Sequence, residues 1–511
     1  MVFNQHIVLS YPVVSHRVSV LGWQYSLILI QMNSTPSPTV SPREKLNLST
    51  KLAFGAGDLG TAITANISVF YGLLFLTSAA GFDARVAGSV LMVGKIWDAV
   101  NDPIVGVLSD RTVHPWGRRY PWMVFSAIPF GILFFLQWIV PGTNQWFLFG
   151  YYVIIGILFN TAYTAVNLPY TALTPELTSD YNERTSLNSF RFFFSISGSI
   201  FSLILAAIIF GLIPDSPDSL DSTYQEYLVL GAVCAIISVL PIFWCFLGTR
   251  KRVWSGHSVA DNQDNSDSLP MAEQIKIALS NRPFLLVIGI YLCSWLGVQL
   301  TASILPYFVM NWMQLPKATF PQLAIVIQGT ALVMLFVWSA ISKRYGKKSV
   351  YFMGMGLWII AQAGLFFLQP GQVGLMYILA ILAGCGVSTA YLVPWSIIPD
   401  VIDLDELNTG QRREGVFYSF MVFLQKIGLA IGLFLVGQAL GFAGFISTTP
   451  DNPVPIQPDS ALLAIRFAIG PLPTVFLIIG IIFTFLYPIT KEVHADILLQ
   501  LSERKRNKNL N

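Results

Sequence analysis

The sequence predicts an all-α membrane protein with twelve transmembrane helices, arranged as two pseudo-symmetric halves of six helices each. Three observations lead to this fold class. The 511 residues are 54% hydrophobic and 11% charged, with a mean hydropathy of +0.62, whereas a soluble domain carries about 25% charged residues. The apolar residues gather in runs of roughly the 20 residues that a helix needs to cross a bilayer. Motifs of the first half of the chain also recur in the second.

Residues 1–50 are expected to be a disordered N-terminal extension, because the apolar patch 20–32 is too short for a span and a Ser/Thr/Pro-rich stretch follows it. The long polar segment 249–282 divides the remaining chain into an N-terminal half, 51–248, and a C-terminal half, 283–490, before a tail at 491–511. The expected spans are 52–79, 84–109, 121–141, 145–174, 187–213, 226–248, 283–312, 319–342, 349–369, 371–401, 415–446 and 461–489.

Lysine and arginine fall in alternate loops. They occur before the first span and after the second, sixth, eighth and tenth, whereas the loops 214–225 and 448–460 contain aspartate but neither Lys nor Arg. Because cytoplasmic loops carry the excess of Lys and Arg, we expect both termini and the central loop on the cytoplasmic side of the plasma membrane.

The two halves share paired motifs. Gly117-Arg118-Arg119 after the second span corresponds to Gly346-Lys347-Lys348 after the eighth. Pro175-Glu176 at the end of the fourth span corresponds to Pro399-Asp400 at the end of the tenth. Glycine-basic loops are generic membrane anchors, but the matched proline pairs favour an internal repeat.

The second span carries Lys95, Asp98 and Asp102 at spacings that place them on one helical face. A charge at the bilayer centre costs roughly 2.5–3.5 kcal/mol on insertion scales, so this stripe must face protein, water or an ion. It predicts a cation or proton site with two carboxylates. A structural salt bridge between helices, or carboxylates near the cytoplasmic interface, are the alternatives.

Other chemistries have weaker support. The four cysteines lie in apolar runs without CxxC spacing, and the five histidines fall in tails or loops, so we expect no structural metal site and no cofactor. A net charge of +3 without a long internal basic tract argues against nucleic acid as a partner. The sequence contains no GxxxxGK[ST] motif, which argues against ATP-driven transport. Gly55-Ala-Gly57-Asp58 matches the GxGD string of intramembrane aspartyl proteases, but the Tyr-Asp that those enzymes also need is absent.

These motifs resemble those of the glycoside–pentoside–hexuronide:cation symporter family, within the major facilitator superfamily. The resemblance covers about residues 51–490. It is carried by Lys51-Leu-Ala-Phe-Gly-Ala-Gly-Asp58, Lys95-Ile-Trp-Asp98-Ala-Val-Asn-Asp102-Pro103, Asn167-Leu-Pro169-Tyr170, Glu183-Arg184, Arg191-Phe-Phe and Glu414-Gly415-Val-Phe-Tyr418-Ser419.

The resemblance implies that Asp98 and Asp102 bind Na⁺, Li⁺ or H⁺ with help from Thr164. It also implies that Lys426 joins this cluster, since it lies about 16 Å along a helix from Gly415; a snorkelling lysine is the alternative.

The substrate half of the site departs from the family. Ala62 and Thr171 stand where sugar-binding permeases have an acidic and an aromatic residue. The remaining candidates for substrate binding are Asn167, Tyr163, Arg191, Lys426, Tyr391 and Trp395. Ordinary packing is the alternative for the three aromatic residues, and a membrane anchor is the alternative for Arg191. Asp58 can be a carboxylate at a helix start.

Charged residues at the predicted cytoplasmic ends of both halves form a candidate gate, pairing between the halves when that side closes. They are Asp180, Glu183, Arg184, Asp400, Asp403, Glu406, Arg412 and Arg413.

The predicted function is cation-coupled symport, with Na⁺ or H⁺, of a sugar or glycoside by a monomer in contact with membrane lipid. A lysolipid or other amphiphile is the alternative cargo. An intramembrane enzyme or a non-transporting sensor is the alternative of another class.

Overall fold

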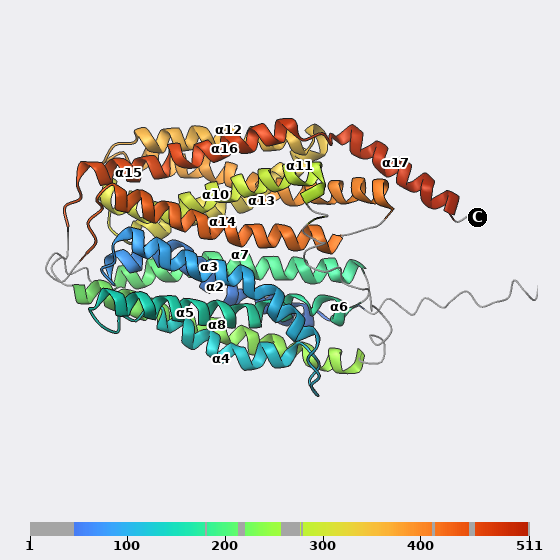
Figure 1. Cartoon of the computed structure of the whole chain (residues 1–511), viewed down its shortest axis with the longest axis horizontal. Coiled ribbons are helices and arrows are strands. Elements are labelled where there is room, and N and C mark those ends of the chain that lie inside the picture. Colours follow the sequence, from blue (N-terminus) through green and yellow to red (C-terminus); the bar gives the residue numbers. More distant parts are fainter. Residues whose placement is uncertain are drawn as a thin grey trace, which may run out of the picture. The chain divides into compact units, whose positions relative to one another are not determined.

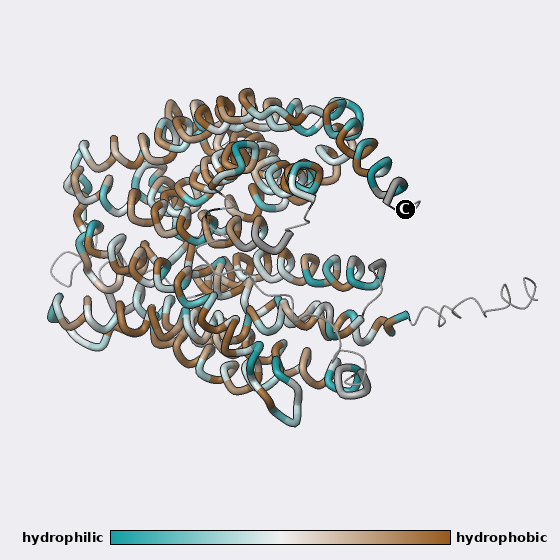
Figure 2. The backbone as a smooth tube through the Cα atoms, turned by 45° about the vertical axis from the view of Figure 1, so that its right-hand side comes forward, coloured by the Kyte–Doolittle hydropathy of each residue, from teal (hydrophilic) through white to brown (hydrophobic). Residues whose placement is uncertain are grey.

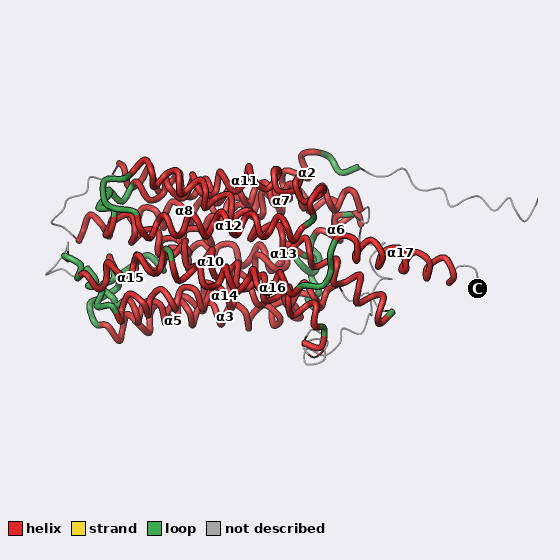
Figure 3. The backbone as a smooth tube through the Cα atoms, turned by 90° about the horizontal axis from the view of Figure 1, so that it is seen from above, coloured by secondary structure: helices red, strands yellow, loops and turns green. Residues whose placement is uncertain are grey.

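The computed structural model describes residues 45–178, 181–212, 220–256, 276, 279–410, 414–448 and 455–508. Residues 47–511 form one compact unit. In the described part of the chain this unit is built of helices and contains no strand. The long helices lie side by side with the loops at their two ends (Figure 3). Hydrophobic residues follow their middle stretches, and hydrophilic residues are most frequent near the ends (Figure 2).

The N-terminal half contains six long helices and one short one. Helix α2 packs against α7 and α8, while α5 packs against α3 and α4. Aromatic rings of α2 fill the interior of this half, including the fully buried Phe54 and Tyr71. The helices are α2 (Leu48–Ser78), α3 (Ala84–Asp110), α4 (Tyr120–Leu136), α5 (Gln145–Thr171), α6 (Thr174–Leu177), α7 (Tyr181–Leu212) and α8 (Leu220–Gly256).

The C-terminal half repeats this plan around the fully buried Trp358. Helix α13 packs against α11 and α12, and α10 packs against α14 and α16. Figure 1 shows the two halves as two groups of helices, α2–α8 and α10–α16. The elements are α10 (Arg282–Tyr307), the π-helical turn η2 (Phe308–Trp312), α11 (Thr319–Tyr345), α12 (Lys347–Phe367), α13 (Val373–Thr409), α14 (Glu414–Phe442), α15 (Asp459–Ile469), α16 (Pro471–Leu486) and α17 (Lys491–Lys508).

The expected spans correspond to these helices, with differences in detail. The twelfth is interrupted at Gly470, whose φ of −108° and ψ of −84° are not helical; Pro471 and Pro473 follow, and neither can donate a backbone hydrogen bond. In the described part of the chain, ten helical spans are long and apolar enough to cross a membrane, and α4 is a shorter apolar helix. Helix α3 is long enough but carries the three charges of its central stripe. The count of twelve therefore stays a prediction.

The paired motifs occupy equivalent places in the two halves. Arg118 Nε lies 2.8 Å from Glu176 Oε1, and Lys347 Nζ lies 2.7 Å from Asp400 Oδ2. The glycine before each basic pair has a positive φ, +90° at Gly117 and +82° for the other, a region that favours glycine. The same turn and the same kind of ion pair thus close equivalent loops. We call the end of the bundle that carries these loops the basic end.

The halves meet along three helix pairs: α3 with α14, α7 with α11, and α2 with α10. Several contacts between them lie towards the end away from the basic loops, which we call the opposite end. Tyr307 shares a hydrogen bond of 2.7 Å with Thr77, and Gln438 Nε2 donates to the Arg85 carbonyl at 3.2 Å. The glycine at 437 lies directly against Ala84 and its neighbours on α3. The opposite end is therefore closed by direct contact between the halves.

Candidate functional site

A cluster of two carboxylates and one ammonium joins the two halves. Asp98 and Asp102 project from the same face of α3, and Lys426 comes from α14. Lys426 Nζ lies 3.0 Å from Asp98 Oδ1 and 2.7 Å from Asp102 Oδ2. Asp98 is 3% exposed. The predicted meeting of these three residues is present in the structure, and Lys426 is held within the bundle as the partner of both aspartates.

The hydroxyl of Thr164 on α5 completes the cluster. Its Oγ1 lies 3.1 Å from Asp98 Oδ1 and 3.0 Å from Asp102 Oδ1. A hydroxyl carries a single proton, so it can donate to one carboxylate at a time. The hydroxyl oxygen therefore lies against one oxygen of each carboxylate, and one of these, Asp98 Oδ1, also accepts from the Lys426 ammonium. Carboxylate and hydroxyl oxygens of this kind suit a small hard cation, so the donor set fits Na⁺, Li⁺ or an added proton.

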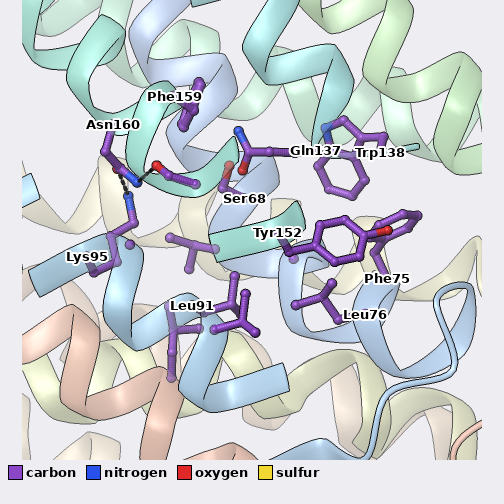
Figure 4. Close-up of a pocket in the computed structure, with 16 residues that line it drawn as sticks. Ser68, Phe75, Leu76, Leu91, Lys95, Gln137, Trp138, Tyr152, Phe159 and Asn160 are labelled. Carbon is purple, nitrogen blue, oxygen red and sulfur yellow. Dashed lines mark hydrogen bonds between the residues drawn. The ribbon is translucent and has the colours of Figure 1, made fainter. Parts of the chain in front are cut away.

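Lys95, the third charge of the α3 stripe, is held by a different partner. Its Nζ donates to Asn160 Oδ1 at 3.0 Å, and Asn160 Nδ2 donates to the Gly156 carbonyl at 2.7 Å. These two bonds fix the orientation of the amide. Figure 4 shows Lys95 and Asn160 at one side of a cavity. The cavity has a volume of about 50 Å³ and is lined by residues of the N-terminal half and by Leu433 of α14. Asn160 was not among the predicted site residues, although its place one helical turn before Thr164 was a usable signal.

A second charged pair lies between α2 and α7. Arg191 Nε is 3.4 Å from Asp58 Oδ2, and Thr61 Oγ1 donates to Asp58 Oδ1 at 3.1 Å. The ring of Tyr163 on α5 packs against Phe130 and Phe159, with ring centres 6.2 Å apart in each pair. Asp58 thus has an ion-pair role inside the bundle, and its partner there is an arginine, whereas an aspartyl protease would need a second acid.

The remaining substrate candidates are divided between the halves. Asn167 on α5 has a buried Oδ1 that finds no hydrogen-bond partner among the described residues. Tyr391 and Trp395 lie on α13. The ring centre of Tyr391 is 5.7 Å from that of Trp295, and the ring of Trp395 stacks on Tyr418 with ring centres 6.1 Å apart. Tyr391 and Trp395 are 40% and 37% exposed. The structure brings these two rings into one aromatic cluster of the C-terminal half, and Tyr163, Asn167 and Arg191 belong to the other half.

Several gate candidates have partners in the described part of the chain. Glu183 Oε2 lies 2.9 Å from Lys51 Nζ, and Arg184 Nε donates to the Thr178 carbonyl. Asp400 pairs with Lys347.

Further along α13, Asp403 Oδ2 lies 3.1 Å from Nε2 of His494 on α17, and Glu406 accepts a backbone bond from Gly410 through its carbonyl. Asp180, Arg412 and Arg413 lie outside the described residues, so the gate as a whole stays a prediction.

Within the described residues, no group of three or more His, Cys, Asp or Glu side chains could hold a metal ion. The four cysteines, Cys234, Cys245, Cys293 and Cys385, are free thiols. Ion binding at the Asp98–Asp102–Thr164 cluster is the chemistry that the described part of the chain can support best.

A family model described as MFS/sugar transport protein matches residues 53–491. The chain is 51% identical to the uncharacterized symporter sll1374 of Synechocystis, over 91% of this chain and 99% of that protein. It is 28% identical to the sodium-dependent lysophosphatidylcholine symporter 1-A of Danio rerio, over 88% and 87% of the two chains.

Among solved structures, the fold is similar to a bacterial homolog of the human lysosomal transporter Spinster, with a TM-score of 0.64, 13% identity and 89% and 97% of the two chains covered. It is also similar to the xylose transporter XylE of E. coli, with a TM-score of 0.54, 15% identity and 87% and 98% of the two chains covered.

Proposed function

The chain belongs to the MFS/sugar transport protein family, and from this premise we propose that it is a Na⁺-coupled symporter of an amphiphilic solute. The family and the relatives make it a multi-pass membrane transporter and not an enzyme. The observation that carries the coupling proposal is the contact of one ammonium with two carboxylates across the interface between the halves.

In this proposal the basic end faces the cytoplasm of the cell that bears the protein in its plasma membrane, because Lys and Arg are enriched on that side. The contacts between the halves at the opposite end then correspond to a closed external side. The proposed state is therefore inward-facing, one of the two that alternating access requires.

Asp98, Asp102 and Thr164 are the proposed Na⁺ ligands. Their crowded oxygens support this assignment, and so does the sodium dependence stated in the names of relatives such as the lysophosphatidylcholine symporters. Lys426 would occupy the carboxylates when Na⁺ is away. An arriving Na⁺ competes for the same oxygens, weakens the contact of α14 with α3, and so changes how firmly the halves are held together.

For the cargo we propose an amphiphile with a charged headgroup, of the lysophospholipid class. The Asp58–Arg191 pair lies beside exposed apolar surface: the Arg191 guanidinium is 5.3 Å from the centre of the Phe192 ring, and Phe192 is 57% exposed. A charged pair next to apolar rings suits a solute with both characters. The names of several relatives agree. Ala62 lacks the carboxylate that would bind sugar hydroxyls, and Thr171 lacks the ring on which a sugar would stack.

A sugar or glycoside is the second candidate cargo. The unpartnered Oδ1 of Asn167 could accept a bond from a sugar hydroxyl. The exposed rings of Tyr391 and Trp395 could stack on a sugar face. In both cases Tyr163, Asn167, Arg191 and Lys426 would contribute from the side of the cation cluster.

The test is uptake by purified protein in proteoliposomes under an inward Na⁺ gradient. The panel consists of radiolabelled lysophosphatidylcholine, with external albumin to remove unincorporated lipid, and labelled melibiose and xylose. Matched vesicles carry a K⁺ gradient or a proton gradient without Na⁺. We expect Na⁺-driven accumulation of the lysolipid. Accumulation of a sugar in its place selects the second cargo, proton-driven uptake replaces the coupling ion, and uptake indifferent to every gradient contradicts symport.

A further inference from the structure

Four charged side chains of the bundle interior interact with one another. They are Lys95, Asp98 and Asp102 on α3 and Lys426 on α14: Lys426 contacts both aspartates, and Lys95 interacts electrostatically with all three of the others. Two lysines and two aspartates sum to zero when no coupling ion is present. Sequence analysis recognised the charge of Lys95, but the proposed cation site gives it no role.

Lys95 does not form an ion pair with the aspartates in the described residues, but it lies close enough for its charge to act on them. Asn160 holds the ammonium at 3.0 Å, and within the part of the chain that the structure describes Lys95 forms no ion pair. Besides Lys95 and Asn160, the cavity in Figure 4 is lined by Ser68, Gln137, Trp138 and Tyr152 and by apolar residues, with no carboxylate among its lining residues. Among the described residues, Ser68 Oγ and Trp138 Nε1 have no hydrogen-bond partner. The cavity lining thus supplies no acidic group to offset the lysine.

We propose that Lys95 is a coupling residue, whose charge keeps the Na⁺-loaded carrier from changing conformation until an anionic group of the solute binds beside the cluster. This inference rests on the proposed cation site and deepens it, because it specifies a chemical property of the cargo. The anionic group can belong to a zwitterion, as a phosphate does in a lysophospholipid, or to an acid.

The net charge of the four-residue cluster changes through the transport cycle. The empty carrier is neutral, the carrier with Na⁺ alone has one excess positive charge, and the carrier with Na⁺ and an anionic group is neutral again. An uncompensated charge in a closed, low-dielectric interior is costly. The empty and fully loaded forms can therefore close and reorient, while the form with Na⁺ alone is held back. Those are the conditions that a tightly coupled symporter must meet.

Replacing Lys95 by a neutral residue would reverse these conditions. The carrier with Na⁺ alone becomes neutral and free to reorient, whereas the empty carrier acquires an uncompensated negative charge. Such a variant exchanges Na⁺ for Na⁺ without cargo and returns slowly when empty. Lys95 isolates this charge effect better than Lys426 does, because its hydrogen bond to Asn160 stays inside the N-terminal half, while Lys426 also ties the two halves together.

The experiment measures exchange of external ²²Na⁺ for internal Na⁺ in proteoliposomes without cargo, for the wild type, Lys95→Gln, Lys95→Arg and the control Lys491→Gln on the exposed α17. We expect the Na⁺ exchange rate of Lys95→Gln to exceed the rates of the wild type and the other two variants roughly tenfold. This is the order of magnitude that the electrostatic energy of one unit charge sets. Net Na⁺-driven uptake by Lys95→Gln should fall while its Na⁺ exchange rises. Exchange by Lys95→Gln no faster than that of the wild type overturns the proposal.

A second measurement needs no variant. Wild-type protein is offered lysophosphatidylcholine, an uncharged monoacylglycerol with the same acyl chain, and an uncharged glycoside, each with a Na⁺ gradient. We expect Na⁺ entry to accompany the lysophospholipid and neither uncharged compound. Equal Na⁺ coupling to an uncharged compound overturns the role of Lys95 but leaves Na⁺ symport intact. Absence of Na⁺ dependence for every compound contradicts the proposed function itself.

Discussion

The ammonium of Lys426 on α14 lies 3.0 Å from Oδ1 of Asp98 on α3, and this contact joins residues 328 positions apart in the chain. Asp98 is buried, and the side chain of Lys426 is 18% exposed. The two helices belong to different halves of the bundle. The contact therefore couples the charge state of the α3 carboxylates to the contact between the halves.

Removing Lys426 alone should lower the stability of the protein more than neutralising both Lys426 and Asp98. Truncating one member of a buried ion pair typically costs about 3 kcal/mol, because the other charge stays buried. We expect Lys426→Ala to lower the thermal stability of the Na⁺-free protein and Lys426→Ala with Asp98→Asn to recover part of the loss. Melting temperatures of the wild type, both single variants and the double variant complete the cycle. Strictly additive losses would show that the two side chains do not interact.

Loss of the Thr164 hydroxyl should weaken cation binding without disturbing the fold. Thr164→Val keeps the shape of the side chain and removes the oxygen shared by both carboxylates. Hydrogen bonds to charged groups contribute about 1.5–3 kcal/mol, so the apparent affinity for Na⁺ should fall roughly tenfold or more. Thr474→Val on α16, whose hydroxyl bonds to its own helix, is the matched control. Equal Na⁺ affinities in the two variants would remove Thr164 from the site.

A methyl group at Gly437 should open the opposite end. A Cβ there would lie 2.5 Å from the Ala84 carbonyl oxygen, and such overpacking costs typically 1–3 kcal/mol. Gly437→Ala should therefore shift the equilibrium between the closed and open forms of the opposite end roughly fivefold or more towards the open form. Gly329→Ala, where the added Cβ meets open space, is the control.

The readout is maleimide labelling of a cysteine at Gln328, which bonds to Asn66 across the interface, in protein whose native cysteines are replaced by serine. Faster labelling in Gly437→Ala and not in Gly329→Ala is expected, and equal rates would mean that this contact does not open in the cycle.

The ion pair between Lys317 and Glu226 should act on the same equilibrium. Lys317 precedes α11 and Glu226 lies on α8; their side chains are 7% and 1% exposed. The ammonium also lies 4.0 Å from the centre of the Tyr227 ring. Lys317→Met removes the partner of a buried carboxylate, so we expect about 3 kcal/mol of lost stability and faster labelling of the cysteine at 328. Adding Glu226→Gln to Lys317→Met should restore part of the stability and bring the labelling rate part of the way back to that of the wild type. A double variant no better than Lys317→Met would argue against the pair as a tie between the halves.

Much of the fold followed from the sequence because its determinants are local or periodic. The apolar spans, the loop pairs at Gly117 and Gly346 and the stripe from Lys95 to Asp102 each depend on residues close in the chain. Lys426 could be assigned to the cluster because of its depth in an apolar span and because of the family resemblance. The interruption at Gly470 was missed, since the surrounding residues are as apolar as those of an unbroken span.

The contacts that sequence reasoning missed depend on distant partners. Lys317 lies in a short linker, and nothing near it in the chain indicates Glu226, which is 91 residues away. The partnership of Asp58 with Arg191 requires knowing that α2 and α7 are neighbours. Asn160 looked like one polar residue among many on α5 until the structure placed it against Lys95. Such pairs arise from helix packing, which the hydrophobic pattern does not specify.

Equilibrium binding of ²²Na⁺ to purified protein, without cargo, tests the cation site most directly. The comparison is between the wild type, Asp98→Asn, Asp102→Asn and the control Asp459→Asn, an exposed carboxylate at the start of α15. We predict saturable binding by the wild type and the control, and loss of at least about tenfold in affinity for each α3 variant, because each removes one of two anionic ligands. Binding by Asp98→Asn and Asp102→Asn with wild-type affinity would contradict the assignment of the coupling site to this cluster.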